Sequence, residues 1–278
     1  MSSALPKARL TASPARIYFS FSSSVSLNAR HLQHLVATAI LPSRERNVLQ
    51  QPDGEGSMNE EERGLLAAVV ERVRTVLEEE DEAREKLLKL TREVTRLCRK
   101  AIFKMHEGEL SSAKELLAST AELVREILAF KISHPRLYYG GSVTSALAEY
   151  VEAKALLAYL EGSRMPSFEE LGVEPEHYLL GISDFAGELR RLLVRSLSAG
   201  RPLEAERALK LMEEVYRALA TIAVPEALVP GLRRKVDVLR ALVESSARDI
   251  LYYEVSSGLE KLMEEALAKR GAAERGTV

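Results

Sequence analysis

Apolar residues recur at intervals of three and four positions along most of the chain after residue 58, which is the period of an α-helix. The longest such stripe runs from Leu65 to Met105 without an internal Gly or Pro, and Gly108 is its first plausible stop. It predicts one long helix or two helices in line. No stretch alternates with the period of two that a half-buried strand requires. The pattern therefore predicts an all-α fold.

Cap residues and helix breakers divide the rest of the pattern. Pro135, Gly162 and Gly200 end helical stretches, and Pro225 and Pro230 flank a turn. The further helices are predicted over residues 111–130, 142–160, 175–200 and 202–221, then over a segment that ends near residue 253, and over residues 257–269. We therefore expect one domain of about seven helices over residues 58–270, followed by a frayed tail over residues 271–278.

The first 57 residues differ from the remainder in composition. They are rich in Ser and carry six basic against three acidic residues, whereas residues 60–278 contain neither Asn nor Gln. The loss of thermolabile amides beside abundant charged residues is typical of proteins from thermophiles. A basic, Ser-rich leader also resembles a transit peptide, but organelles do not fit that composition. We expect residues 1–57 to be disordered or a wrongly assigned start, outside the fold, with Met58 as the true first residue.

Composition and cysteine usage restrict the class of protein. The 278 residues include 39 basic and 41 acidic side chains and a single cysteine, Cys98, which cannot form an internal disulfide. Cys98 lies at helical spacing from Val94 and Ile102, which indicates a buried thiol. No uncharged stretch is long and apolar enough to span a bilayer. We expect a cytoplasmic protein that does not bind membranes.

Several kinds of catalytic site lack sequence support. The chain has no Gly-rich phosphate loop, no G-x-S-x-G, no C-x-x-C and no H-E-x-x-H motif. Its one Glu-x-x-His pattern, Glu174 with His177, spans Pro175 and has no second copy, whereas a ferritin-like di-iron core needs two. His177 is interpreted as a polar group at a helix start.

Two pairs of acidic residues stand out on consecutive predicted helices. Glu149 and Glu152 are three residues apart, and Asp184 and Glu188 are four apart, so each pair repels itself across one helical turn. If the two helices pack antiparallel, the four carboxylates can converge into an oxygen cage that suits Mg²⁺, with Mn²⁺ as a substitute. The alternative is that each pair faces solvent, as most charged helix faces do.

The same residues resemble a known family. The segment E-Y-V-E-A from Glu149 to Ala153, followed by the segment from Tyr178 to Arg191, is similar to motifs of the translin family, and specifically of its Trax-type branch. The stretch from Leu232 through Tyr252 resembles the C-terminal helices of that family. The resemblance implies a seven-helix fold, a hollow barrel of about eight subunits, binding of single-stranded nucleic acid inside it, and Mg²⁺-dependent endoribonuclease activity in Trax-type chains.

The resemblance also assigns roles to residues. Glu149, Glu152, Asp184 and Glu188 match the catalytic, metal-binding acids of the Trax-type branch, which the non-cutting translin branch lacks. We therefore expect a homo-oligomeric, Mg²⁺-dependent endoribonuclease that acts on single-stranded RNA. The first alternative is a single-stranded RNA- or DNA-binding protein without catalysis. The second is a structural helical oligomer whose acid pairs face solvent.

Candidate nucleic-acid contacts come from basic residues on two predicted helices. They are Arg92, Arg96, Arg99, Lys100, Lys104 and His106 near the end of the first helix, and Arg191 and Arg195 beside the second acid pair. Cations at a helix C-terminus are also explained by the helix dipole, and Arg191 can pair with Glu188 instead. Residues 233–235 form a weaker second basic cluster, and Tyr150 is expected in the core.

Overall fold

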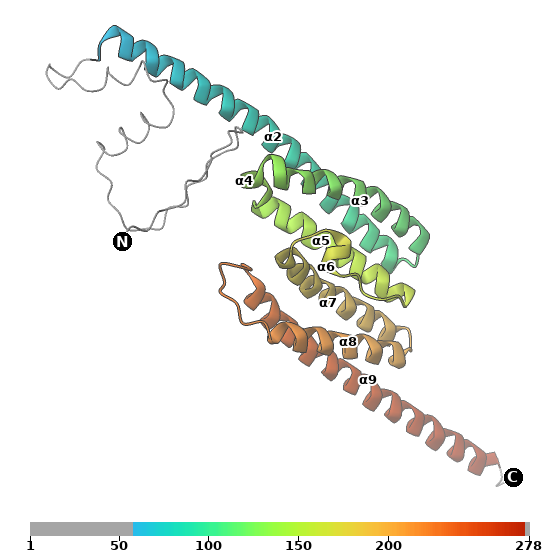
Figure 1. The fold of residues 1–278 in the computed structure, drawn as a ribbon. Helices are drawn as coiled ribbons and strands as arrows, with labels where there is room; N and C mark the ends of the chain where they lie inside the picture. Colours follow the sequence, from blue (N-terminus) through green and yellow to red (C-terminus); the bar gives the residue numbers. More distant parts are fainter. Residues whose placement is uncertain (1–57, 276–278) are drawn as a thin grey trace, which may run out of the picture. The chain divides into compact units, whose positions relative to one another are not determined.

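The computed structural model describes residues 58–275, and helices account for nearly all of this range (Figure 1). Over the described residues there are eight helices: α2 (Glu60–His106), α3 (Leu110–Ser133), α4 (Pro135–Tyr138), α5 (Gly141–Glu161), α6 (Phe168–Leu171), α7 (Pro175–Ser198), α8 (Pro202–Ala220) and α9 (Leu232–Arg275). The all-α prediction is confirmed. None of these helices combines the length and the hydrophobicity that crossing a membrane requires.

The observed helices differ from the predicted ones in two respects. The short helices α4 and α6 were not predicted, because four residues are too few to show an apolar period. The predicted break between residues 253 and 257 is wrong, since α9 runs without interruption from Leu232 to Arg275. Gly258 alone does not end a helix, because an internal glycine costs only about 1 kcal/mol relative to alanine.

Helix α5 lies at the centre of the bundle. Eleven of its residues are buried, on all of its faces, and it packs closely against α7, which in turn contacts α8 and α9 (Figure 1). The Cys98 side chain on α2 and the Tyr150 side chain on α5 both lie in this core, which confirms the predictions for these two residues.

Helices α5 and α7 run in the same direction, and the antiparallel packing expected from the sequence is wrong. Tyr138, just before α5, packs its ring edge-on against His177 in the first turn of α7. Further along α5, Ala148 faces Gly181, which lies one turn after His177 in α7. The connection of residues 162–174 can extend to at most roughly 40 Å, whereas α5 is about 30 Å long. It is therefore long enough to return the chain to the start of α5 (Figure 1).

Gly181 sets the distance between α5 and α7. A Cβ atom at this position would lie 2.5 Å from the backbone oxygen of Ala148 and 2.6 Å from the Cβ of Val151. Only glycine permits such an approach. Because Glu152 follows Val151 and Asp184 lies one turn after Gly181, this contact brings the two acid pairs onto facing sides of α5 and α7.

Candidate active site

The four acids predicted from the sequence lie on α5 and α7, which pack closely against each other. Burial is the largest cause that raises the pKa of Glu152, from an ordinary 4.5 to about 8, and the charges of Asp184, Glu149 and Glu188 raise it further. An effect from all three requires that they lie close to Glu152 in a poorly solvated region. The charges of the other three acids thus act on Glu152, and we refer to the four residues as the carboxylate cluster.

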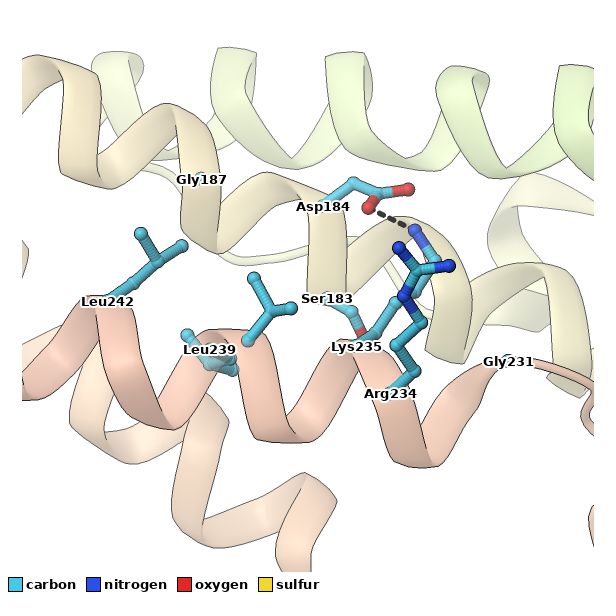
Figure 2. Close-up of a pocket in the computed structure, with 9 residues that line it drawn as sticks. Ser183, Asp184, Gly187, Gly231, Arg234, Lys235, Leu239 and Leu242 are labelled. Atoms are coloured by element: carbon cyan, nitrogen blue, oxygen red, sulfur yellow. Dashed lines mark hydrogen bonds and ion pairs between the residues drawn. The ribbon is translucent and has the colours of Figure 1, made fainter.

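Two of these carboxylates are paired with cations from distant helices. Arg99 of α2 donates to Oε1 of Glu149 from Nη2 at 2.7 Å and from Nε at 3.1 Å. Lys235 of α9 forms an ion pair with Asp184 of α7 (Figure 2). Arg99, which we predicted to contact nucleic acid, is thus paired with Glu149, and its side chain remains 69% exposed.

Glu188 is held by histidine and arginine. The side chain of His106, the last residue of α2, is only 4% exposed and hydrogen-bonds Glu188 through Nε2. Arg191 donates to Glu188 Oε2 at 3.2 Å, and Arg195 donates to the backbone oxygen of His106 at 2.5 Å. This burial removes His106 from the nucleic-acid surface to which we assigned it and places it in the carboxylate cluster. The alternative of an Arg191–Glu188 pair is confirmed.

Glu152 differs from the other three acids in having no counter-ion. Among residues 58–275, its side chain forms neither an ion pair nor a hydrogen bond, although it is largely buried. The nearby charge of Lys235 lowers the pKa of Glu152 only in part, so this carboxyl group retains its proton at neutral pH.

The residues present fit a hard divalent cation. Carboxylate oxygens are the ligands that Mg²⁺ and Mn²⁺ prefer. A cation beside Glu152 would offset the cost of burying its negative charge and would reduce the repulsion from the neighbouring acids. In the arrangement observed for residues 58–275, no three acidic, histidine or cysteine side chains are grouped as metal ligands. The other three carboxylates are instead paired with Arg99, Lys235 and His106.

Neither Cys98 nor His177 belongs to this chemistry. Burial, followed by the charges of Glu149 and Glu152, raises the pKa of the Cys98 thiol strongly, so the reactive thiolate is suppressed. His177 Nδ1 accepts from the backbone nitrogen of Glu174 at 3.3 Å in a helix cap and is 1% exposed. This contact confirms the predicted role of His177 at a helix start.

The remaining basic candidates on α2 only partly share a surface. Arg92, Arg96 and Arg99 line a shallow groove of about 430 Å³ that also includes Ser142 at the start of α5. Arg96 is paired with Glu93 within α2. Lys100 and Lys104 line a different groove, next to α3, where Lys104 is paired with Glu107 and Glu109.

Sequence reasoning did not place Lys235 at the acids. It named Lys235 only within a basic cluster at residues 233–235, and no spacing rule connects a lysine with an aspartate 51 positions earlier in the chain. The signal that was available is weak. Three cations occupy the first turns of α9, where the helix dipole disfavours positive charge.

Known proteins resemble this chain over most of its described length. The model of the translin family matches residues 82–246. An uncharacterised protein of Methanocaldococcus jannaschii is 32% identical over 179 residues, which are 64% of this chain and 79% of that protein. The translin-associated protein X homolog of Schizosaccharomyces pombe is 22% identical over 204 residues, 66% of this chain and 86% of that protein.

Two solved structures have a similar arrangement of helices. The complex of AfC3PO with duplex RNA superimposes with a TM-score of 0.62 at 35% identity, covering 67% of this chain and 97% of that one. The apo form of NeC3PO gives a TM-score of 0.61 at 26% identity, covering 71% and 100%. Since the family match spans more than half of the chain and the fold agrees with it, this protein belongs to the translin family.

Proposed function

We propose that this protein is a Mg²⁺-dependent endoribonuclease that cuts single-stranded RNA inside an oligomeric barrel. The observation that carries the proposal is the largely buried Glu152, which forms no ion pair among the described residues and whose pKa is raised by burial and by the charges of three further carboxylates. Retaining such a group costs stability, which is typical of a site kept for function. The likeness to AfC3PO, which was solved with duplex RNA, supports RNA as the substrate class.

Each acid has a role in this proposal. Glu149, Glu152, Asp184 and Glu188 would hold Mg²⁺, or Mn²⁺ in its place. The bound ion would activate a water and stabilise the charge that develops on the scissile phosphate. In the absence of the metal ion, Arg99 and Lys235 neutralise Glu149 and Asp184 and so reduce the repulsion among the four carboxylates. His106 orients Glu188 from the end of α2.

The assembly is proposed to be a homo-oligomer of about eight subunits. Two long apolar stripes are exposed on the isolated chain, and contiguous apolar surface of this extent marks an interface. On α2 the stripe comprises Leu66, Val69, Val70, Val73, Val76 and Leu77, and on α9 it comprises Leu251, Tyr252, Val255, Leu259, Leu262 and Leu267. Their spacing of three and four residues suits packing against helices of further copies.

The test compares cleavage by the wild-type chain with cleavage by Glu152→Gln. Labelled single-stranded and duplex RNA are incubated at high temperature with Mg²⁺, with Mn²⁺ or with chelator, and the products are separated on a gel. We expect metal-dependent cutting of the single strand by the wild type and at least about a hundredfold slower cutting by Glu152→Gln. The control is Glu126→Gln, which removes an exposed carboxylate of α3 that forms no ion pair within residues 58–275 and should leave cutting unchanged.

A binding protein without catalysis is the second candidate. The ion pairs of Arg99 and Lys235 favour it, because they satisfy two of the four acids without any metal. If RNA binds but no divalent cation supports cutting, this candidate replaces the first. If RNA neither binds nor is cut, both candidates are wrong.

A further inference from the structure

We infer that the groove between α7 and the first turns of α9 binds a backbone phosphate of the nucleic acid, through Arg234 and Lys235. The inference rests on the proposed function, because it places the phosphate beside the carboxylate cluster. It assigns Arg234 and Lys235 as substrate-binding residues, and it gives Lys235 a second partner besides Asp184.

The groove opens directly beside one of the four acids. It has a volume of about 430 Å³, and its lining residues are Ser183, Asp184, Gly187, Gly231, Arg234, Lys235, Val238, Leu239 and Leu242 (Figure 2). Gly187 leaves space on the α7 side, since a Cβ atom there would meet nothing within 4 Å. One wall thus carries a metal-binding candidate and the other carries two cations.

Arg234 is available to an anion. Among the described residues the exposed Arg234 side chain forms no ion pair and no hydrogen bond, whereas its neighbour Arg233 lies 4.0 Å from Glu226. Figure 2 shows Arg234 and Lys235 side by side, both extending from α9 toward Asp184. A guanidinium group binds phosphate oxygens in a bidentate manner, and a free one at the edge of a groove is suited to that contact.

Lys235 has to change partner when a divalent cation enters the cluster. With no cation present, its ammonium group compensates Asp184. A dication held by Asp184 would take over that role and would repel the ammonium group at short range. Lys235 lies in the same groove as Arg234, so the displaced ammonium group is placed to bind a phosphate there. Metal binding and phosphate binding are thereby coupled through one side chain.

The structural alternative is that Arg234 and Lys235 only stabilise the start of α9. Helix energetics argue against it, because cations in the first turn are unfavourable by roughly 0.3–1 kcal/mol each. Lys235 recovers this cost through Asp184. Arg234 has no such compensation in the described structure, and an anion bound in the groove would supply it.

The experiment measures RNA affinity by fluorescence anisotropy with a labelled 20-nucleotide single-stranded RNA, over a series of salt concentrations. It is done in chelator and again with Ca²⁺, and a gel verifies that the RNA stays intact. The variants are Arg234→Ala and Lys235→Met, and Arg233→Ala is the matched control, since it removes the same charge from the same helical turn but lies outside the groove. The full chain is used throughout.

We expect Arg234→Ala to weaken binding about fivefold to tenfold in both conditions and to reduce the salt slope by about 0.7, the value for one phosphate contact on a single strand. Lys235→Met should weaken binding only with Ca²⁺, because in chelator Lys235 is engaged by Asp184. Arg233→Ala should stay within about twofold of the wild type.

Each result decides between the two proposals. If Arg234→Ala behaves like Arg233→Ala while the wild type still cuts RNA, the inference is wrong and the proposed function stands. If Arg234→Ala weakens binding as expected but the wild type cuts nothing with Mg²⁺, the phosphate site stands and the nuclease proposal is wrong. A wild type that binds no RNA overturns both.

Discussion

Replacing Glu152 by Gln should make the protein more stable while abolishing the proposed activity. The raised pKa of Glu152, about 8 against an ordinary 4.5, measures how strongly the folded state disfavours its charge. At about 1.36 kcal/mol for each pKa unit, the ionised carboxylate costs at most about 5 kcal/mol of unfolding free energy. Glutamine keeps the shape of the side chain and carries no charge, so Glu152→Gln should recover at least about 2 kcal/mol of this cost.

The increase in stability expected for Glu152→Gln depends on pH in a defined direction. Below about pH 4.5 the carboxyl group is protonated in the folded and unfolded states, so Glu152→Gln and the wild type should be equally stable. Between pH 4.5 and 8 the unfolded chain has released this proton and the folded chain has not. The stability of the wild type therefore falls relative to the variant as pH rises through this interval. Above about pH 8 the difference should be constant.

The assay is guanidinium denaturation followed by circular dichroism, in chelator, at one protein concentration, since oligomerisation contributes to apparent stability. Wild type, Glu152→Gln and Glu126→Gln are compared at pH 4.5, 6, 7.5 and 9. Adding Mg²⁺ at pH 9 should stabilise the wild type more than Glu152→Gln. Equal stability of Glu152→Gln and Glu126→Gln at pH 9 would refute the argument that the four acids share one poorly solvated region.

Four further variants test the fold around the site and the proposed assembly. Gly181→Ala should destabilise the protein by about 1–3 kcal/mol, because its Cβ atom would lie 2.5 Å from a backbone oxygen of α5. Gly187→Ala lies in an open part of the same helix and should stabilise the protein by up to about 1 kcal/mol. Both changes are measured by denaturation. Ser167→Ala should cost about 1 kcal/mol in the same assay, since it removes the capping box of α6. Leu259→Asp together with Leu262→Asp should reduce the mass measured by light scattering if the exposed stripe of α9 is a subunit interface, and an unchanged mass would exclude that role.

Local signals in the sequence predicted the helices and the identity of the four acids. Apolar periodicity, with Gly and Pro as breakers, identified the long helices α2, α3, α5, α7 and α8 to within a few residues. Spacing alone showed that Glu149 and Glu152 share one face of α5, and that Asp184 and Glu188 share one face of α7. These features depend only on residues within one or two helical turns, so they can be predicted from the sequence without knowledge of the three-dimensional fold.

Contacts between helices that are distant in the sequence could not be predicted from such local signals. The direction of α7 relative to α5 depends on the path of residues 162–174, which contain a short helix and a capping box that periodicity does not report. The counter-ions come from the end of α2 and the start of α9, and charge patterns along one helix cannot indicate which distant helix packs beside it. His106 is the clearest case, because in sequence it belongs to a basic cluster and in the structure it is a buried partner of Glu188.

These counter-ions explain how four neighbouring carboxylates are accommodated in the folded protein without a metal ion. Arg99 and Lys235 are attached to helices other than α5 and α7, so Glu149 and Asp184 are neutralised from outside, whereas Glu188 pairs with Arg191 of its own helix and with His106 of α2. A divalent cation can then replace both contacts without breaking any bond within α5 or α7. Glu152 forms no ion pair or hydrogen bond in the described structure, and the charge of Lys235 offsets its raised pKa only in part, so a cation of higher charge would favour that exchange. Metal affinity should therefore fall most in Glu152→Gln and rise in Lys235→Met, and isothermal titration with Mg²⁺ in the absence of RNA distinguishes these opposite changes.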